Sequence, residues 1–526
     1  MTYDTIIVGA GSAGCVLANR LSANPNHRVL LLEAGGRDWH PFIHMPAGIA
    51  KMVNRKGINW DYSTEPEAQL DNRRLWWPRG KVLGGSSSIN AMCYIRGDAR
   101  DYDEWARMVG DERWNWNGVL PYFKRAEGNT RGASELHGAD GPLAVQDLKY
   151  HNALTQAFVD AAQGTGLPLN PDFNGTTQLG AGFYQVTQKD GARCSTAASY
   201  LHAARGRANL TVRTRAVTQH VLLDGHRAVG VDYRHNGRLT RAEAREVILC
   251  GGAINSPQLL MLSGVGPADH LRAHGIRAAH DLPGVGANLQ DHLDICTLQH
   301  CTQPVSYDRL NEVAVALEYL LRHDGPGTSN IAEGGAFVRT RLAPDERCDV
   351  QLHFIPALLD DHGRHRLPGY GYTLHACNLR PRSRGTIRLK SADPAAKAEI
   401  RANYLSDGDG HDLATMIEGA KLSREIFAAT AFDAYRGEEI FPGSAVTTDA
   451  GLADFIRRKA ETVYHPVGSC RMGNDDQAVV DSQLRVRGVA GLRVVDASVM
   501  PCLPGGNTNA PTIMIAERAA DMIAAA

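Results

Sequence analysis

The chain opens with two short runs of apolar residues separated by a stretch of different periodicity. The runs cover residues 5–8 and 29–32 and consist of Ile, Leu and Val with a single Thr. Between them, apolar residues recur with helical spacing at Cys15, Val16, Leu17, Ala18 and Leu21. Unbroken apolar strands are typical of a parallel sheet covered on both faces. The pattern therefore predicts a β-α-β unit at the start of the fold.

The hydrophobic pattern changes further along the chain. It predicts a β-meander with strands at residues 210–212, 217–223, 229–233 and 247–249, followed by a helix at 254–262. From about residue 301 to 458, glycine clusters become rare, which indicates a second domain. Glycine-rich turns then return around a short strand at 492–495, and a final helix is predicted at 512–525.

Composition excludes several classes of function. The chain has 526 residues, with 56 Lys and Arg against 57 Asp and Glu, so its formal net charge is −1. Nucleic acid is not expected as the main partner, because phosphate binding needs a basic excess. Apolar runs long enough for a membrane-spanning helix, about 18 residues, are absent. The N-terminus does not resemble a signal peptide, so the expected compartment is the cytoplasm.

A glycine turn joins the first predicted strand to the helix that follows. Gly9, Gly11 and Gly14 have the spacing of a dinucleotide-binding turn, and Glu33 ends the second predicted strand. The glycines permit a tight bend, a close approach of pyrophosphate and close helix packing, and the helix N-terminus offers free N–H groups. Glu33 would accept hydrogen bonds from a ribose and repel a 2′-phosphate. The turn predicts bound NAD or FAD and argues against NADP.

Further motifs follow the glycine turn in a fixed order. They are residues 80–90 (GKVLGGSSSIN), 252–266 (GAINSPQLLMLSGVG), 465–473 (HPVGSCRMG), 496–498 (DAS) and 507–512 (NTNAPT). Together with the glycine turn they resemble the glucose-methanol-choline (GMC) oxidoreductases, from residue 6 to residue 517. Within that family the chain is most similar in appearance to bacterial sorbose, alcohol and choline dehydrogenases.

The resemblance implies FAD and an α/β fold of two domains. A Rossmann-like FAD-binding domain would be assembled from residues 1–155, 203–300 and 459–526. An α+β substrate-binding domain with an antiparallel sheet would be built from residues 156–202 and 301–458. Ile89 stands where some relatives carry the histidine that bonds covalently to the flavin, so non-covalent FAD is expected. The implied FAD contacts are Gly9, Gly11, Ser12, Ala13, Gly14, Glu33, Ala34, Val82, Gly84, Gly85, Ser86, Asn90, Ala91, Met92, Val217, Asp496, Ala497, Asn507 and Thr508.

The resemblance also implies two catalytic side chains. His465 would remove the hydroxyl proton of an alcohol, and histidine suits this task because its ordinary pKa of about 6.5 lies near working pH. Asn509 would donate its amide N–H to the substrate oxygen as negative charge develops. Tyr464 and Glu333 are candidate substrate contacts. The segment around Glu333 resembles one whose carboxylate faces the substrate in choline-oxidising relatives.

The leading hypothesis is an FAD-dependent dehydrogenase that oxidises a primary alcohol to an aldehyde by hydride transfer to flavin N5. Residues 40–48, 170–175 and 193–197 resemble bacterial sorbose dehydrogenases, which makes a sugar or polyol a candidate substrate. A choline-type or aliphatic-alcohol dehydrogenase, or an oxidase, is the alternative. The family also includes hydroxynitrile lyases with non-redox FAD, in which His465 would serve equally well as the base.

The expected partners are a small-molecule alcohol and an electron acceptor, and no motif distinguishes oxygen from a quinone. A quinone acceptor would bring the protein to the surface of the inner membrane, although the sequence shows no anchor. No metal is expected, because the ten cysteines lack regular spacing and are interpreted as reduced thiols. His362 and His365, which lie near Asp360, are expected in a solvated loop.

Overall fold

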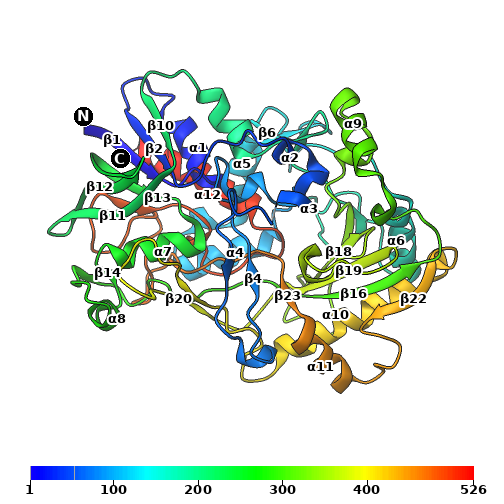
Figure 1. Ribbon diagram of the computed structural model, residues 1–526. Coiled ribbons are helices and arrows are strands. Elements are labelled where there is room, and N and C mark those ends of the chain that lie inside the picture. The colour runs from blue at the N-terminus through cyan, green and yellow to red at the C-terminus, as the bar shows by residue number, and fades with distance from the viewer. Residues whose placement is uncertain (1, 53, 526) are drawn as a thin grey trace.

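The computed structural model describes residues 2–52 and 54–525, and this part of the chain contains two seven-stranded sheets (Figure 1). The strands of the first sheet are β1 (Thr2–Val8), β2 (Val29–Glu33), β10 (Leu210–Thr214), β11 (Ala216–Asp224), β12 (Arg227–His235), β13 (Arg238–Leu249) and β24 (Leu492–Val494). They lie in the order β10-β2-β1-β13-β12-β11, with β24 beside β13. β10, β2, β1, β13 and β24 are parallel, and β11 to β13 form an antiparallel meander.

The predicted β-α-β unit is confirmed, with α1 (Ser12–Leu21) between β1 and β2. The predicted meander is correct for its last three strands and wrong for the first. β10 pairs in parallel with β2 at the opposite edge of the sheet. Asn209 explains this position, because its side-chain amide donates to the backbone carbonyls of Ser22, Asn24 and His27 in the loop before β2. These contacts join two segments almost 200 residues apart, which local periodicity does not register.

The second sheet is entirely antiparallel and lies beside the first (Figure 1). Its strands are β7 (Gly180–Phe183), β16 (Leu293–Cys301), β17 (Gly334–Val338), β18 (Val350–Ile355), β19 (Gly371–Asn378), β22 (Arg436–Phe441) and β23 (Glu461–Thr462). β16 and β23 fall in segments that the sequence assigned to the first domain. Because both strands pair inside the second sheet, we propose that the later segment of the second domain begins near residue 293 and that the domain also includes residues 461–462. Residues 1, 53 and 526 of the predicted division lie outside the described residues.

Helices cover both sheets. The longer ones are α4 (Ala99–Val109), α5 (Trp116–Ala126), α6 (Ala153–Gly164), α7 (Gly252–Leu262), α9 (Glu312–Arg322), α10 (His411–Ala428), α11 (Asp449–Lys459) and α12 (Asn509–Ala524). α1 packs on α12 beside the first sheet, and α10 packs on β16 and β19 of the second. The shorter ones are α2 (Pro41–His44), α3 (Ile49–Met52) and α8 (Ala268–Ala273). None of the helices within residues 2–52 and 54–525 has the length and apolar character that crossing a membrane requires.

A proline inside α7 is compensated from a distant segment. Pro257 has no N–H to donate to the carbonyl of Ala253, one turn earlier. The hydroxyl of Ser469 donates to that carbonyl at 2.5 Å. This contact attaches the start of α7 to the segment that carries His465.

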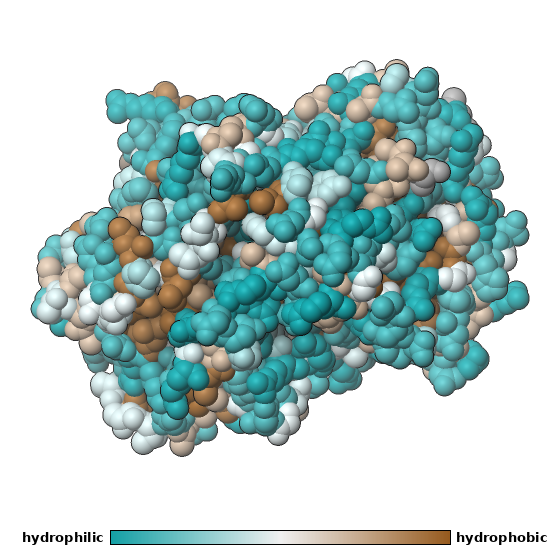
Figure 2. Space-filling model, turned by 180° about the vertical axis from the view of Figure 1, so that it is seen from behind, coloured by the Kyte–Doolittle hydropathy of each residue, from teal (hydrophilic) through white to brown (hydrophobic). Residues whose placement is uncertain are grey.

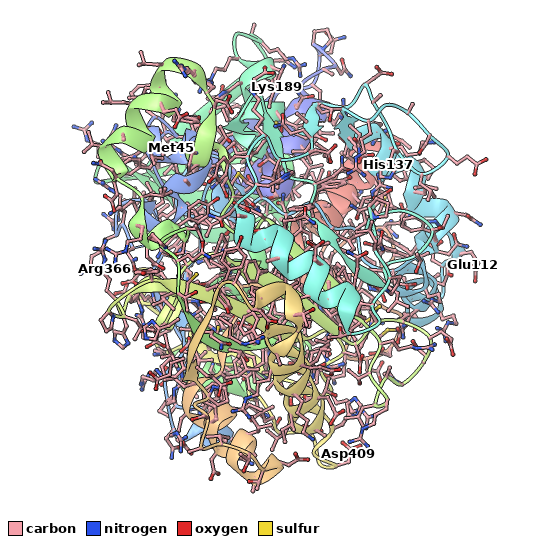
Figure 3. All side chains as sticks on the ribbon, turned by 90° about the vertical axis from the view of Figure 1, so that its right-hand side faces the viewer. Met45, Glu112, His137, Lys189, Arg366 and Asp409 are labelled. Carbon is pink, nitrogen blue, oxygen red and sulfur yellow. The ribbon has the colours of Figure 1, made fainter. Side chains whose placement is uncertain are left out.

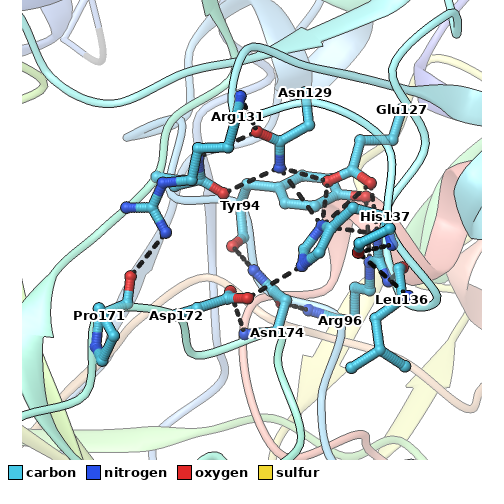
Figure 4. Close-up of polar contacts among 12 residues, drawn as sticks. Tyr94, Arg96, Glu127, Asn129, Arg131, Leu136, His137, Pro171, Asp172 and Asn174 are labelled. Atoms are coloured by element: carbon cyan, nitrogen blue, oxygen red, sulfur yellow. Dashed lines mark hydrogen bonds and ion pairs between the residues drawn. The ribbon is translucent and has the colours of Figure 1, made fainter.

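A buried network of charges ties residues 94–96 to the loops at 127–137 and 170–174 (Figure 4). Arg96 pairs with Glu127 at 2.6 Å, and both side chains are fully buried. His137 lies between two carboxylates, 2.9 Å from Asp172 and 3.0 Å from Glu127. Hydrogen bonds to Asp172 and Glu127 raise the pKa of His137 to about 9. The network therefore holds a charged histidine inside the folded protein at neutral pH.

Candidate active site

A cavity of about 500 Å³ begins where the parallel strands of the first sheet end. It is lined by residues that follow β1, β2, β13 and β24, which is where ligands bind in open parallel sheets. Residues 85–93, 463–466 and 507–509 add walls from other parts of the chain. All the motifs singled out in the sequence therefore meet around one space.

The glycine turn has the geometry expected of a pyrophosphate site. Gly9 has a φ of +105°, a conformation that favours glycine. A Cβ atom on Gly14 would lie 1.8 Å from the carbonyl oxygen of Gly9, so the helix packs as closely as predicted. A Cβ atom on Gly11 would meet only the Cα of Gly85, at 4.0 Å. Gly11 thus faces open space, into which the phosphates of a dinucleotide fit.

Three helices point their N-termini at the same cavity. α1, α7 and α12 begin after Gly11, Gly251 and Thr508, and none of these three residues caps its helix with its own side chain. In α7 the first N–H, that of Gly252, donates to Asp496 at 2.8 Å. Residues 11–13, 251–253 and 508–509 line the cavity. Free N–H groups at a helix N-terminus attract anions, so this arrangement suits a bound pyrophosphate.

Glu33 lies at the predicted position for a ribose contact. It is buried, lines the cavity, and accepts the backbone N–H groups of Ala10 at 2.9 Å and Gly35 at 2.7 Å. Burial raises the pKa of Glu33 to about 7. Each carboxylate oxygen takes one backbone N–H and retains a lone pair toward the cavity, which matches a ribose with two hydroxyls.

Most predicted cofactor contacts line the cavity. They are Gly9, Gly11, Ser12, Ala13, Glu33, Ala34, Gly85, Ser86, Asn90, Ala91, Met92, Val217, Asp496, Ala497, Asn507 and Thr508. Gly14, Val82 and Gly84 are not part of the lining and shape it from behind. Gly84 donates its N–H to the carbonyl of Ala10 at 2.7 Å, and Val82 is buried in an apolar cluster with Ile89. The side chain of Ile89 also lines the cavity and has no nucleophilic atom for a covalent bond to flavin.

His465 is buried at one end of this cavity and is held from three directions. Its Nδ1 lies 3.0 Å from Nδ1 of His292, and its Nε2 lies 3.2 Å from the amide nitrogen of Asn507. Its backbone N–H donates to Asp291 at 2.8 Å. Burial, then the neighbouring His292, His353 and Arg79, hold the pKa of His465 well below its usual value. The ring is therefore neutral at working pH.

The side-chain amide that contacts His465 is that of Asn507, whereas the sequence analysis expected Asn509 in this place. Asn509 is the first residue of α12, and its Oδ1 accepts the hydroxyl of Ser12 at 2.7 Å. Asn507 lies in the turn before the helix, and this places its amide toward the second sheet. The two asparagines line the same cavity but face different neighbours, so we propose that Asn507 takes the catalytic role expected of Asn509.

Two residues that the sequence did not single out set the orientation of this pair. Gln351 on β18 donates to Oδ1 of Asn507 at 3.1 Å, so the amide nitrogen of Asn507 must point toward His465. Since an amide nitrogen only donates, Nε2 of His465 carries the lone pair and Nδ1 carries the proton. That proton faces His292, whose pKa burial lowers to about 3. No local sequence pattern marks Gln351 or His292 as part of the site. Gln351 lies on β18 of the second sheet, and His292 directly precedes β16 of the same sheet.

Tyr464 and Arg79 form a wall next to His465. Tyr464, the candidate substrate contact, lines the cavity with a φ of +70°, and its hydroxyl is hydrogen-bonded to Nδ1 of His362. Arg79 also lines the cavity and donates to the backbone carbonyls of Pro78 at 2.5 Å and Tyr464 at 2.8 Å. Burial lowers the pKa of Arg79, whose charge is balanced in part by Asp291. The wall beside His465 therefore carries a positive charge.

Glu333 does not reach the cavity, so the expected contact with substrate is not seen. It is fully buried, and its oxygens accept from the backbone of Asn152 at 2.8 Å, from Thr155 and Ser329 at 2.7 Å each, and from Tyr307. These four donors occupy the carboxylate. Glu333 instead joins the start of α6, through Asn152 and Thr155, to Tyr307 and Ser329.

The loop with His362 differs from its predicted solvated state. The side chain of His362 is 6% exposed, and its Nε2 lies 2.8 Å from Glu461. His365 is exposed, as predicted. Ligand-type atoms of Asp361, His362 and Glu461 lie within 4.8 Å of one another, as do those of Asp294, Cys296 and His375. The histidine of each group already has hydrogen-bond partners. His362 is bonded to Glu461 and Tyr464, and His375 is bonded to Asp294 and Cys296.

Comparison with known proteins agrees with this geometry. The family model described as GMC oxidoreductase matches with its N-terminal part over residues 3–294 and its C-terminal part over residues 381–516. The chain is 52% identical to an alcohol dehydrogenase (acceptor) of Pseudomonas putida, over 99% of this chain and 95% of that protein. It is 47% identical to the mitochondrial choline dehydrogenase of Mus musculus, over 99% and 89%. Pyridoxine 4-oxidase from Mesorbium loti has the same fold, with a TM-score of 0.91, 33% identity and full coverage of both chains.

The fold and the cavity define a flavin-dependent oxidoreductase that acts on CH–OH groups. The chain belongs to the GMC oxidoreductase family. The predicted two-domain α/β fold and the predicted FAD cofactor are thereby confirmed. The residues of the glycine turn, Glu33 and the helix N-termini fit the pyrophosphate and ribose of FAD.

Proposed function

We propose that the protein is an FAD-dependent dehydrogenase that oxidises an uncharged primary alcohol to the aldehyde, with His465 as the base. The main support is the neutral His465, whose Nε2 lone pair is held by Asn507 inside the FAD cavity. Bound FAD supplies the redox chemistry, because its N5 accepts a hydride from the alcohol carbon. The residues of the chain must then remove the hydroxyl proton and hold the substrate oxygen.

His465 and Asn507 together can do both. A hydroxyl oxygen that enters beside the pair accepts the amide N–H of Asn507 and donates its proton to Nε2 of His465. The Nδ1–H of the protonated ring still faces His292, which keeps the ring in place. Burial and the charge of Arg79 oppose a lasting positive charge on the ring, so His465 returns its proton readily.

The charges around the cavity favour an uncharged substrate over choline. A quaternary ammonium is stabilised by a nearby carboxylate or by the faces of aromatic rings, and Trp60, Tyr62 and Tyr464 are aromatic residues of the lining. The charges of the lining, in contrast, do not favour a cation. In the described lining the carboxylates are Glu33 and Asp496. Asp496 already accepts from Ser256, Ser498 and the N–H of Gly252, and Glu33 lies at the ribose position. Beside His465 the cavity instead presents the cation of Arg79.

The Pseudomonas putida relative is named an alcohol dehydrogenase, which agrees with this substrate class. Because choline dehydrogenases are 47% identical to this chain, choline is the alternative substrate to test. An anaerobic screen with holoenzyme separates them. We expect 1-alkanols to bleach the flavin absorption and choline to bleach it much more slowly. Sorbose is included in the screen to test a polyol as substrate. Faster bleaching by choline than by every 1-alkanol would overturn the assignment of an uncharged substrate.

The hydroxynitrile lyase hypothesis predicts a different result when the flavin absorption is measured in the same way. A lyase would release aldehyde from a cyanohydrin while the flavin stayed oxidised. We expect bleaching by an alcohol and no accelerated release of aldehyde from the cyanohydrin. Aldehyde release without bleaching would replace the dehydrogenase by a lyase.

A further inference from the structure

Three side chains with metal-ligating atoms meet on the second sheet, beside the FAD cavity. Asp294 and Cys296 are alternate residues of β16, so their side chains point to the same face of the sheet. His375 lies directly opposite Cys296 on the neighbouring strand β19. Ala376, the next residue of β19, faces α10, which covers the outer face of this sheet together with α6 (Figure 3). The three side chains therefore lie on the inner face of the sheet.

The group brings one nitrogen, one oxygen and one sulfur atom close together. Nδ1 of His375 lies 2.5 Å from Oδ2 of Asp294 and 3.1 Å from Sγ of Cys296, and this oxygen and sulfur lie 3.6 Å apart. Ligand atoms around a tetrahedral zinc ion are about 3.3–3.6 Å apart, because their bonds to zinc are about 2.0–2.3 Å long. The oxygen and sulfur are therefore already suitably spaced, and the imidazole must move by less than about 1 Å.

The carboxylate of Asp294 is buried with little positive charge around it. Its side chain is 1% exposed, and its Oδ1 has no hydrogen-bond partner. Within residues 2–52 and 54–525, neither a lysine nor an arginine pairs with it. Its ion-pair partner there is His375, an imidazole that is charged only when protonated. Because burying a carboxylate is costly unless its charge is balanced, a cation bound at this place would stabilise it.

The other candidate group, Asp361, His362 and Glu461, differs on this point. Asp361 pairs with Arg364 at 2.7 Å. Glu461 pairs with Arg73 at 2.7 Å. Both ring nitrogens of His362 also have hydrogen-bond partners. The charges of this group are therefore balanced within the protein, and the group serves as an internal control.

We propose that Asp294, Cys296 and His375 form a binding site for one Zn²⁺ ion. One thiolate, one imidazole and one carboxylate suit zinc, whereas Mg²⁺ and Ca²⁺ prefer oxygen ligands alone. Binding replaces the thiol proton of Cys296 and any proton on Nδ1 of His375, and these protons pass to solvent. Both side chains are partly exposed, so the ion and the protons have a path. Sequence spacing does not reveal the site, because His375 is 79 residues from Cys296.

The proposed zinc site lies close to the proposed base. Burial raises the pKa of Tyr464, the residue before His465, and the nearby carboxylate of Asp294 contributes to this shift. The two positive charges of a bound ion would oppose the charge that His465 gains when it takes the substrate proton. Zinc should therefore slow alcohol oxidation. This consequence rests on the proposed function, whereas zinc binding itself does not.

Calorimetric titration of the holoenzyme with Zn²⁺, after dialysis against a chelator, tests the site. The surface is mainly hydrophilic, as the view from behind in Figure 2 shows, so exposed carboxylates can bind zinc weakly at many places. We expect one tight equivalent that is separate from this weak binding. Cys296→Ser and His375→Asn should each weaken the tight binding at least about tenfold, with FAD retained. Cys502→Ser, at another partly exposed cysteine, and His362→Gln, in the internal control group, should bind zinc like the wild type.

Two further readouts identify the ligand and the consequence. Cd²⁺ bound to a thiolate absorbs in the ultraviolet, and this absorption should arise in the wild type and in Cys502→Ser but not in Cys296→Ser. Zinc should also slow the anaerobic bleaching of flavin by a 1-alkanol in the wild type, and much less in Cys296→Ser. The titration needs no substrate, so its failure is distinct from a failure of the proposed dehydrogenase function.

Three outcomes would overturn the proposal. The first is a wild type with weak surface binding only, without a tight equivalent of zinc. The second is a Cys296→Ser protein that binds zinc as tightly as the wild type. The third is a tight equivalent that is lost in His362→Gln and kept in Cys296→Ser and His375→Asn, because the ion would then lie in the other group.

Discussion

The chemistry of the site depends on the direction of one amide. Gln351 fixes Oδ1 of Asn507, and this leaves the amide nitrogen of Asn507 to face Nε2 of His465. The sequence singles out both asparagines of the motif at residues 507–512, but it places Asn509 beside His465, where the structure has Asn507. That choice depends on where α12 begins, since Asn507 precedes the helix and Asn509 opens it. A two-residue difference of this kind is decided by packing against the second sheet.

Paired substitutions separate the two asparagines. Asn507→Ala should lower kcat by about 10²-fold with FAD retained, because it removes a donor to the developing negative charge on the substrate oxygen. Asn509→Ala should leave kcat within about threefold and loosen FAD instead, because it removes only the contact with Ser12. Steady-state kinetics and the flavin absorption of the purified proteins provide the readouts. The reverse ranking of the two kcat values would restore Asn509 as the catalytic partner.

Gln351 should act through Asn507 alone. Gln351→Met keeps the length of the side chain but removes the donor at 3.1 Å, so the amide of Asn507 is free to turn away from His465. We expect kcat to fall about threefold to tenfold, the equivalent of one hydrogen bond, with an unchanged flavin spectrum. Gln351→Glu is the informative companion, because its ionised carboxylate cannot donate and should not restore the activity. Wild-type kcat in both variants would remove Gln351 from the account.

At the scale of elements, the first β-α-β unit was predictable because its signals are local. Gly9, Gly11, Gly14 and Glu33 lie within 25 residues, and each has a direct steric or polar requirement there. The partner of β10 and the compensation of Pro257 by Ser469 were not predictable. Both depend on segments nearly 200 residues away or more, and sequence periodicity does not encode which distant segments meet.

Two glycines of the same turn should fail in different ways. Gly11→Val places its side chain in the open space of the cavity, so the protein should fold but purify without FAD. Gly14→Val would place its Cβ 1.8 Å from the carbonyl of Gly9, so the fold itself should be lost. Circular dichroism and flavin absorption distinguish the two results. A yellow Gly11→Val protein would show that pyrophosphate does not approach the backbone at this position.

At the scale of the whole molecule, the site exists only where the two sheets meet. The first sheet supplies the FAD cavity, and Gln351 on the second sheet contacts Asn507 of the proposed catalytic pair. The sequence predicted two domains, but β16 and β23 show that the second sheet takes strands from segments assigned to the first. The contacts of Glu333 were not predictable for the same reason, because three of its four donors, Asn152, Thr155 and Tyr307, are 181, 178 and 26 residues away in the sequence.

The buried histidine between Asp172 and Glu127 makes stability depend on pH. Its folded-state pKa of about 9 lies above the ordinary value of about 6.5, so folding is favoured by the bound proton. This stabilisation is fully present below about pH 6.5 and is lost as pH rises through 9. His137→Gln should lower the free energy of unfolding by about 3 kcal/mol at pH 7. Thermal unfolding from pH 6 to 10 should show a fall in the wild type that is reduced in the variant, and parallel curves would contradict this assignment.

The central claim is that a neutral His465 takes the proton of the substrate. The most direct measurement is the rate of flavin bleaching by a 1-alkanol, mixed without oxygen with wild type and His465→Ala at equal FAD content. The account predicts a rate about 10²–10⁴-fold lower in His465→Ala, with the flavin still bound. Bleaching at the wild-type rate in His465→Ala would contradict it, because another group would then have to remove the proton.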